Sequence, residues 1–379
     1  MKVALVGPIW PYRGGIAHYG AALEEALRSR GHDTLLVNYS RLYPSLFFPG
    51  KSQYDDGAGG FSAPSERLVD SLAPWTWLRT ARRICEWGAD AAVLHSWHPF
   101  FAPALGSIAW RLRGKGVPVI VLCHNVRPHE ASFADRALLE ALYRRTRRFL
   151  VQAPVEARAL REMIGPDPAV AIVPHPPYDL FARRFPPIDR AEARRRLGVT
   201  APKLLLFFGY VRPYKGLRVL VEAMPSVLER ADAELVVAGE FYEDVESYRR
   251  RIDELGIGNR VRLMDRYVPN AEVSAFYAAA DLVVVPYLDA TQSGVAQMAV
   301  AYGVPTLVTR AGGLADADDA GGLVRFVPSA TPEMIAAGIV ECLLVPTSRR
   351  TPIGELSPGW IRLAEEVERL AAVPETGSP

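Results

Sequence analysis

The sequence predicts an α/β protein built from two Rossmann-like domains. In each half of the chain, short valine-rich apolar runs alternate with longer amphipathic segments, which is typical of parallel strands joined by helices. The length of 379 residues exceeds the roughly 250–300 residues at which a single hydrophobic core stops growing. A stretch rich in proline and arginine near the middle of the chain is typical of a domain junction. We therefore expect an N-terminal domain over residues 1–176, a linker over 177–200 and a C-terminal domain over 201–357.

Each element follows from its apolar pattern, with strands where apolar runs are short and helices where apolar residues recur every 3.6 positions. The N-terminal strands are predicted at residues 2–6, 33–39, 91–96, 117–123, 149–152 and 169–173. The N-terminal helices are predicted at residues 16–29, 74–87, 103–112, 134–146 and 154–163. The C-terminal strands are predicted at residues 203–208, 234–239 and 282–287, with helices that begin near 216 and 293. An amphipathic helix over residues 358–371 ends the pattern.

The composition is that of an ordinary globular protein, with 23% charged and 49% hydrophobic residues. The formal net charge of +2 argues against nucleic acid as a partner. Cys85, Cys123 and Cys342 lie far apart within apolar patterns, so we expect buried, reduced thiols in a cytosolic compartment. The N-terminal ten residues indicate a first strand rather than a signal peptide, and no uncharged stretch approaches the ~18–20 residues that span a bilayer. We expect a cytoplasmic protein, with any membrane contact peripheral.

A polar turn followed by a helix marks a candidate phosphate site in the C-terminal half. Thr291, Gln292, Ser293 and Gly294 follow a valine-rich strand, and Ser293 is a suitable N-cap for the helix. The first turn of a helix presents unpaired N–H groups and the positive end of the helix dipole, which together bind phosphate. This turn therefore predicts a site for a nucleotide diphosphate.

A second turn points to the same edge of the predicted sheet. Gly209 ends the strand over 203–208, and Arg212 and Lys215 follow before the next helix begins. Both cations are expected to project from the carboxyl edge of a parallel sheet, where open α/β sheets bind ligands.

These two segments, together with the strand that ends in Ala238-Gly239-Glu240, resemble the donor domain of the retaining, nucleotide-sugar-dependent glycosyltransferases of family 4. The resemblance implies the GT-B fold, two Rossmann-like domains that face a central cleft, with the C-terminal helix packed back on the first domain. It also implies transfer of a hexosyl group from a nucleotide-diphosphate sugar to an acceptor hydroxyl with retention, without a metal ion or other cofactor.

The sequence departs from the family pattern at several positions. The paired glutamates of the family become Asp289 and Gln297, and the arginine that usually follows the strand-end glycine becomes Tyr210, with Arg212 displaced by two positions. Gln297 keeps an acceptor oxygen for a ribose hydroxyl but loses the charge of a carboxylate. Asp289 is one methylene shorter than glutamate. The resemblance thus indicates a subgroup with an altered acidic motif.

The resemblance also assigns roles on the phosphate side of the reaction. Arg212, Lys215 and the start of the helix near Ser293 would stabilise the leaving diphosphate, and Asp289 would hold hydroxyls of the donor sugar. The loop GPIWPYRGG, with Gly14 and Gly15, would close over the donor diphosphate and the acceptor; alternatively it is a structural turn.

Several histidines are expected at the carboxyl edge of the N-terminal sheet. His124 matches the family's strand-end histidine that approaches the donor sugar and is therefore a catalytic candidate, while His95 and His98 are acceptor-side candidates. The alternative for each is a histidine satisfied by structural hydrogen bonds. The spacing of His95 and His98 allows a zinc site, but no cysteine or carboxylate completes a ligand set, so no metal is expected.

Other polar residues receive structural interpretations. His175 lies in a stiff proline-rich connector, and the role of His18 is left open. A further loop resembles a metal-binding cluster, but a solvated loop is favoured because the related enzymes use no divalent cation; its residues are Asp316, Asp318 and Asp319. His129 and Glu130 are expected in a loop, where Glu130 caps the next helix.

The acceptor is predicted only as a hypothesis. The helices over 74–87 and 134–149 combine aromatic residues with arginines, which is typical of helices on anionic membranes but also of solvated faces. The apolar loop over 43–60 suits an acceptor pocket or a lipid contact. We expect a glycan or lipid-linked sugar acceptor in envelope or exopolysaccharide synthesis, with peripheral contact at the inner face of an anionic membrane.

Three alternatives compete with this function. One is a degenerate GT-B protein that binds nucleotide sugar without transferring it, because both motif carboxylates have changed. Another is a GT-B enzyme of a different class, such as an epimerase or a phosphorylase. A nicotinamide oxidoreductase is disfavoured because the glycines at 7, 14 and 15 do not form a GxGxxG fingerprint.

Overall fold

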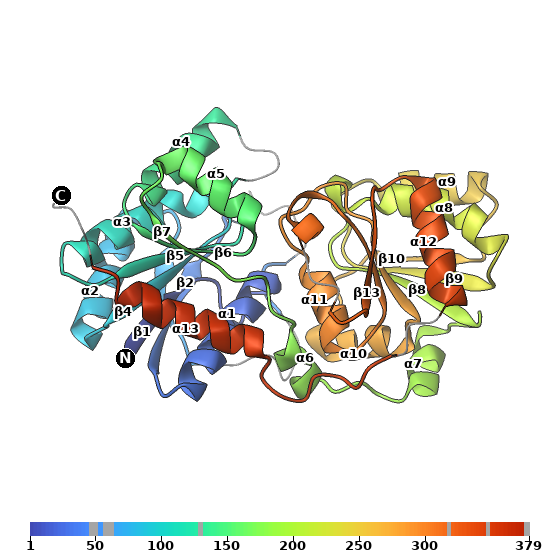
Figure 1. Ribbon diagram of the computed structural model, residues 1–379, viewed down its shortest axis with the longest axis horizontal. Coiled ribbons are helices and arrows are strands. Elements are labelled where there is room, and N and C mark those ends of the chain that lie inside the picture. The colour runs from blue at the N-terminus through green and yellow to red at the C-terminus, as the bar shows by residue number, and fades with distance from the viewer. Residues whose placement is uncertain (45–51, 56–63, 128–131, 317–319, 346–348, 375–379) are drawn as a thin grey trace. The chain divides into compact units, whose positions relative to one another are not determined.

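The computed structural model divides the chain into two compact units (Figure 1). Described residues up to Pro174, together with those from Pro358 onward, form the first unit, and His175 to Ser357 form the second. The structure describes residues 1–44, 52–55, 64–127, 132–316, 320–345 and 349–374.

In its described residues the first unit contains a seven-stranded parallel sheet of order β3-β2-β1-β4-β5-β6-β7. Its strands are β1 (Lys2–Val6), β2 (Asp33–Arg41), β3 (Glu66–Asp70), β4 (Ala91–Ser96), β5 (Val119–Cys123), β6 (Arg148–Val151) and β7 (Ala169–Ile172). Its helices are α1 (Gly15–Ser29), α2 (Pro74–Trp87), η2 (Pro99–Phe101), α3 (Ala102–Arg113), α4 (Phe133–Tyr143), α5 (Pro154–Ile164) and α13 (Pro358–Ala371). The strand order reverses direction between β1 and β4, which makes their carboxyl ends the crevice where such sheets bind ligands.

The helices cover both faces of this sheet, as right-handed crossovers require. Figure 1 shows α1 and α13 on one face and α2, α3 and α4 on the other. α13 packs on α1 through Trp360, which is fully buried and lies edge-on to Tyr19 at a centroid distance of 4.8 Å. Arg30 adds an ion pair with Glu368 at 2.6 Å. The C-terminal helix is therefore an integral part of the first unit.

The strand β3 was not predicted from the sequence. It is an edge strand with only two apolar residues, Leu68 and Val69, so it lacks the continuous apolar run by which buried parallel strands are recognised. Its partner is β2, which the structure extends beyond the predicted end to Arg41.

Among the described residues, the second unit contains a six-stranded parallel sheet of order β10-β9-β8-β11-β12-β13. Its strands are β8 (Lys203–Phe208), β9 (Ala233–Ala238), β10 (Val261–Met264), β11 (Leu282–Val285), β12 (Thr306–Thr309) and β13 (Val324–Val327). Its helices are α6 (Asp179–Arg184), α7 (Arg190–Leu197), η3 (Pro213–Lys215), α8 (Leu217–Leu228), α9 (Val245–Glu254), α10 (Asn270–Ala279), α11 (Gly294–Ala301), η4 (Gly312–Asp316) and α12 (Pro332–Leu344). Here the strand order reverses between β8 and β11, so the ends of these two strands define the second candidate crevice.

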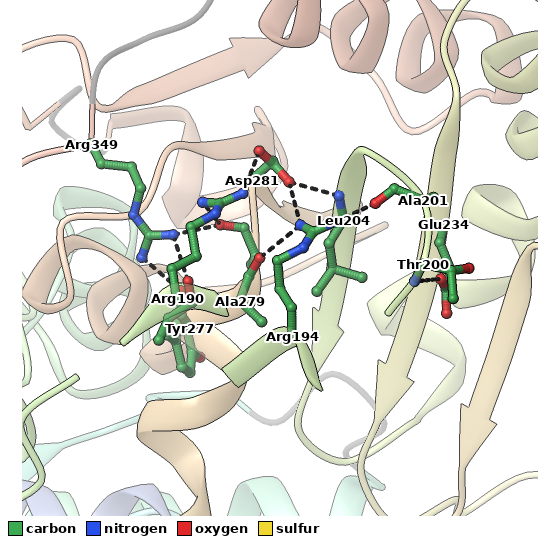
Figure 2. A network of polar contacts seen from close by, with 12 residues as sticks. Arg190, Arg194, Thr200, Ala201, Leu204, Glu234, Tyr277, Ala279, Asp281 and Arg349 are labelled. Atoms are coloured by element: carbon green, nitrogen blue, oxygen red, sulfur yellow. Dashed lines mark hydrogen bonds and ion pairs between the residues drawn. The ribbon is translucent and has the colours of Figure 1, made fainter. Parts of the chain in front are cut away.

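The stretch predicted as a linker, residues 177–200, is folded and belongs to the second unit as α6 and α7. Figure 2 shows why α7 is held there. Arg190 and Arg194 of α7 both pair with Asp281, at 2.7 and 3.2 Å, and Asp281 also accepts the N–H of Leu204 at 2.7 Å. The arginines of the predicted domain junction therefore tie α7 to the start of β8 and the end of α10.

Arg349, from a distant part of the sequence, also contacts the C-terminal end of α10 (Figure 2). Its guanidinium donates to the carbonyl groups of Tyr277, Ala278 and Ala280, which lie at the C-terminal end of α10. A cation at this position pairs with carbonyl groups that a helix leaves unsatisfied and with the negative end of its dipole.

No helix in the described part of the chain is both long enough and apolar enough to cross a membrane.

Candidate active site

The turn after β8 brings a lysine into the interior of the second unit. Gly209 has φ of 88°, and a Cβ atom on Gly239 would lie 2.0 Å from the Gly209 carbonyl oxygen, so the two loops can approach only without a side chain at 239. Gly216, with φ of 68°, ends the following turn against the carbonyl oxygen of Pro286. This backbone directs Lys215 inward between β8 and β11.

Lys215 is a buried cation whose side chain is only 8% exposed. Its Nζ lies 5.6 Å from the ring centroid of Tyr287 and 3.4 Å from the point where a Cβ on Gly209 would be. Burial, and secondarily the positive charge of Arg212, lower the pKa of Lys215 from 10.5 to about 7. No carboxylate among the described residues pairs with it, so an anionic ligand would stabilise its protonated form.

Arg212 is exposed and lies over the Tyr242 ring, with its guanidinium carbon 4.5 Å from the centroid. Tyr210, which occupies the position of the family's arginine, packs edge-on against Tyr242 at 5.2 Å. The two tyrosines therefore fix Arg212 within electrostatic range of Lys215.

The predicted N-terminus of α11 is confirmed. Ser293 is the N-cap, and its Oγ accepts the N–H of Ala296 at 3.2 Å. The N–H groups of Gly294 and Val295 have no acceptor in the described part of the chain. A Cβ on Gly209 would touch Val295 at 3.4 Å, so this first turn lies beside the loop that carries Lys215.

A pair of glycines holds the loop before α11 in place. The N–H of Gly313 donates to Ala290 at 2.7 Å, and a Cβ on Gly313 would lie 2.1 Å from the carbonyl oxygen of Thr291. A Cβ on Gly312 would lie 2.8 Å from a carboxylate oxygen of Asp289, whose side chain is exposed. The Asp289 carboxylate therefore lies beside the Gly-Gly turn, which leaves room for it.

Two glutamines, Gln292 and Gln297, complete this candidate site. The side-chain Oε1 of Gln292 is buried and has no hydrogen-bond partner among the described residues, so it can accept a hydroxyl or N–H from a ligand. Gln297 lies one turn further along α11 and is half-buried. Its backbone carbonyl oxygen accepts the backbone N–H of Tyr178 at 3.4 Å.

In the first unit, His95 and His124 meet at the ends of β4 and β5. The His95 Nδ1 and the His124 Nε2 are 3.0 Å apart, and the amide nitrogen of Gln152 lies 3.5 Å from the His124 Nδ1. One ring nitrogen of His124 therefore faces His95 and the other faces the side-chain amide of Gln152. Burial lowers the pKa of His95 to about 4, so this imidazole is neutral at physiological pH. Gln152 was missed in the sequence, although it directly follows β6 at the same sheet edge.

The remaining candidates of the first unit are His98, Gly14 and Gly15, and Gly7 also contacts the pair. A Cβ on Gly7 would be 3.0 Å from the His95 ring, so the glycine after β1 makes room for it. His98 is exposed, and its Nδ1 accepts the N–H of Phe100 at 3.2 Å as the cap of η2, a local structural contact. Gly14 has φ of 111° and is followed by Gly15, the first residue of α1.

Burial lowers the pKa of His18, on the first turn of α1, to about 3. No group of three histidine, cysteine, aspartate or glutamate side chains able to hold a metal ion occurs in the described ranges. Some residues singled out in the sequence lie outside these ranges, namely His129, Glu130, Asp318, Asp319 and much of the loop over 43–60, and the side chain of Asp316 is also not described.

The two parallel-sheet units have the architecture of the GT-B fold, and solved structures bear out the predicted fold class. The HepE protein from Anabaena matches with a TM-score of 0.68 over 98% of this chain and 97% of its own, at 16% identity. Sucrose-phosphate synthase from Thermosynechococcus elongatus matches with a TM-score of 0.65 over 98% of this chain and 96% of its own, at 19% identity.

Sequence comparisons give the family. The family "Glycosyl transferase 4-like domain" matches residues 14–176, and "Glycosyl transferases group 1" matches residues 202–344. A D-inositol 3-phosphate glycosyltransferase of Catenulispora acidiphila is 32% identical over 311 residues, which are 75% of this chain and 72% of the relative. A second, from Actinosynnema mirum, is 30% identical over 79% of this chain and 77% of the relative. The chain belongs to the family 4 glycosyltransferases, and it is a transferase enzyme.

Proposed function

We propose that the protein transfers a hexosyl group from a nucleotide-diphosphate sugar to an acceptor hydroxyl with retention of configuration. The observation that carries this proposal is Lys215, a buried cation without a carboxylate partner among the described residues, beside the first turn of α11. Cationic side chains and helix N-termini are the groups that bind diphosphates. The structures of HepE are described as complexes with UDP and with UDP-glucose, which supports the same class of donor here.

The reaction follows from where charge develops. As the anomeric C–O bond breaks, negative charge accumulates on the diphosphate, and positive charge accumulates on the sugar ring. Lys215, Arg212 and the N–H groups of α11 stabilise the diphosphate. Asp289 binds sugar hydroxyls and Gln297 the ribose. The acceptor oxygen forms the new bond to the anomeric carbon, and the leaving phosphate oxygen accepts the proton of the acceptor hydroxyl on the same face of the sugar, which gives retention without a protein nucleophile. The positive charge that stabilises the diphosphate comes from protein groups rather than from a metal ion.

Binding and turnover test this proposal separately. Calorimetry with UDP, GDP, ADP and their sugars, without and then with magnesium, identifies the donor, and NMR of the product establishes its anomeric configuration. We expect tight binding of one nucleotide family that is lost in Lys215→Met and kept in Lys203→Met, where the lysine lies at the opposite end of β8. An inverted product would refute retention.

The competing proposal is a degenerate protein that binds nucleotide sugar without transfer. It is favoured by Asp289 and Gln297, which replace the two glutamates of the family motif. Binding without release of nucleoside diphosphate in the presence of a broad acceptor set supports this alternative. The acceptor set should include inositol phosphate, because the relatives are named for it.

For the acceptor we propose a lipid-linked sugar in envelope or exopolysaccharide synthesis, reached by peripheral binding to an anionic membrane. On α2, Trp75 is 73% exposed, Leu78 is 47% exposed and Arg79 is exposed beside them. On the adjacent α3, Trp110 is 62% exposed and is followed by Arg111. Neither arginine has a carboxylate partner in the described part of the chain. Exposed tryptophan beside unpaired arginine matches the interface of an anionic bilayer.

Co-sedimentation with vesicles tests this surface. The wild-type protein should bind phosphatidylglycerol vesicles, and the double variant Trp75→Ser, Trp110→Ser should lose most of that binding. Leu344→Ser is the matched control, because Leu344 is 69% exposed on α12 of the second unit. Equal sedimentation of wild type and double variant would refute the surface.

A further inference from the structure

Tyr178 contacts the first turn of α11 in two ways. It is only 4% exposed, and its ring packs against the first residue of the helix, so that a Cβ on Gly294 would lie 3.2 Å from the ring carbon Cε2 and 3.6 Å from the hydroxyl oxygen. Its backbone N–H donates to the carbonyl of Gln297, one turn further along. Gly294 has no positive φ, so it is the ring of Tyr178, and not the backbone conformation, that crowds a side chain at this position.

His175 fixes the tyrosine side chain. The His175 Nδ1 lies 2.7 Å from the carbonyl oxygen of Pro176, which can only accept, so this nitrogen carries the proton. The His175 Nε2 therefore accepts the hydroxyl proton of Tyr178, at 3.1 Å. Pro176 and Pro177 restrict the backbone between the two residues. Burial lowers the pKa of His175 to about 4, so the acceptor nitrogen stays unprotonated at neutral pH.

The segment that follows Tyr178 supports α11 along its length. α6 packs against α11 (Figure 1). At the far end of α11, the hydroxyl of Tyr302 donates to the carbonyl of Phe185 at 2.9 Å. Asp179, which is fully buried, accepts the N–H of Ser357. Both ends of α11 are therefore held by residues that the sequence suggested were linker.

We propose that Tyr178, oriented by His175, is a positioning residue that sets the first turn of α11 against the diphosphate of the donor. The inference rests on the proposed function, because it assigns Tyr178 to the same phosphate site. Hydrogen bonds from N–H groups to phosphate weaken steeply as distance and angle depart from their optimum. Loss of the Tyr178 hydroxyl frees the ring that defines the position of Gly294, and donor binding weakens even though Tyr178 itself does not touch the donor.

The test compares two tyrosines on the two ends of one helix. Each variant removes one hydroxyl: Tyr178→Phe loses the bond to His175, and Tyr302→Phe loses the bond that the hydroxyl shares between the carbonyl groups of Phe181 and Phe185. A purely structural role therefore predicts similar effects for both variants. We expect Tyr178→Phe to raise the Kd of the nucleotide sugar about three- to tenfold, the equivalent of one ordinary hydrogen bond. Tyr302→Phe should leave that Kd within about twofold of wild type. Its decrease in Tm should be comparable to that of Tyr178→Phe. The probe is whichever of UDP-glucose, GDP-mannose and ADP-glucose the wild-type protein binds.

A steric exchange provides the second arm. Gly294→Ala should weaken donor binding because the new methyl group displaces the Tyr178 ring, and Tyr178→Leu in that background should restore part of the affinity. Unchanged binding in Tyr178→Phe, or an equal loss in Tyr302→Phe, would overturn this inference while leaving the proposed function intact. A wild-type protein that binds none of the three probes refutes the proposed function, and this inference with it.

Discussion

Replacing Lys215 with methionine tests the electrostatic basis of the donor site. In the free protein the pKa of Lys215 lies at about 7, because burial and the neighbouring Arg212 both disfavour the ammonium form. A diphosphate bound at the proposed donor site would reverse this balance, since a nearby opposite charge raises the pKa of a cation. Donor binding is therefore coupled to proton uptake whenever the amine is neutral beforehand.

This coupling gives a pH dependence of definite sign. Below about pH 7 Lys215 is already protonated, and affinity is nearly independent of pH; above it, each unit of pH costs about 1.4 kcal/mol of binding free energy. The Kd of a nucleotide sugar should thus rise about tenfold between about pH 6 and about pH 8. A nucleotide sugar is the right ligand because it lacks a terminal phosphate monoester, whose second pKa lies near 6.

Isothermal titration calorimetry in two buffers of different ionisation enthalpy measures both the Kd of the donor and the number of protons taken up on binding. We expect uptake of roughly one proton per donor at about pH 8 and almost none at about pH 6. Lys215→Met should weaken binding by about 1.5–3 kcal/mol at the lower pH and abolish the pH dependence. Lys203→Met should behave as wild type. A wild-type Kd that does not change across this range, without proton uptake, would refute the coupling between Lys215 and donor binding, and the loss of affinity in Lys215→Met then decides whether the lysine faces the diphosphate.

Three further changes test the structure of the second unit by urea unfolding. Gly216→Ala should destabilise the protein by about 1–3 kcal/mol more than Gly256→Ala. Both glycines have φ near 67°, but only a Cβ on Gly216 would meet a carbonyl oxygen, that of Pro286 at 2.0 Å. Equal losses of stability in the two variants would contradict this contact. Arg349→Met should cost about 1–3 kcal/mol, because carbonyl groups at the end of α10 lose their donor, whereas Arg325→Met, which breaks an exposed ion pair, should cost less than about 1 kcal/mol. Lys215→Met should be more stable than wild type below about pH 7. The unfolded lysine keeps its proton up to its ordinary pKa of 10.5, so the stability of the wild type rises between about pH 7 and pH 10.5, and the advantage of the variant shrinks. A difference in unfolding free energy that stays constant over this range would refute the lowered pKa.

The sequence predicted elements best where local signals were strong. The helix over 74–87 and the strand over 203–208 have the predicted bounds, because proline opens the helix and an uninterrupted apolar run forms the strand. The N-cap Ser293 was also predictable, since a serine before an apolar run satisfies an orphan N–H group by itself. The edge strand β3 escaped prediction because only Val69 of its five residues is buried and the strand has no continuous apolar run.

The sequence by itself determined the class of fold and the local turns and helix cap that make up the candidate phosphate site, because periodicity, glycine turns and helix caps act over a few neighbouring residues. Only the tertiary structure decided which distant side chains meet. It joined Gln152 to the pair His95 and His124 across three neighbouring strands, and it placed Tyr178 against Gly294. Such contacts depend on strand order and on space left by missing Cβ atoms, neither of which is encoded in local spacing.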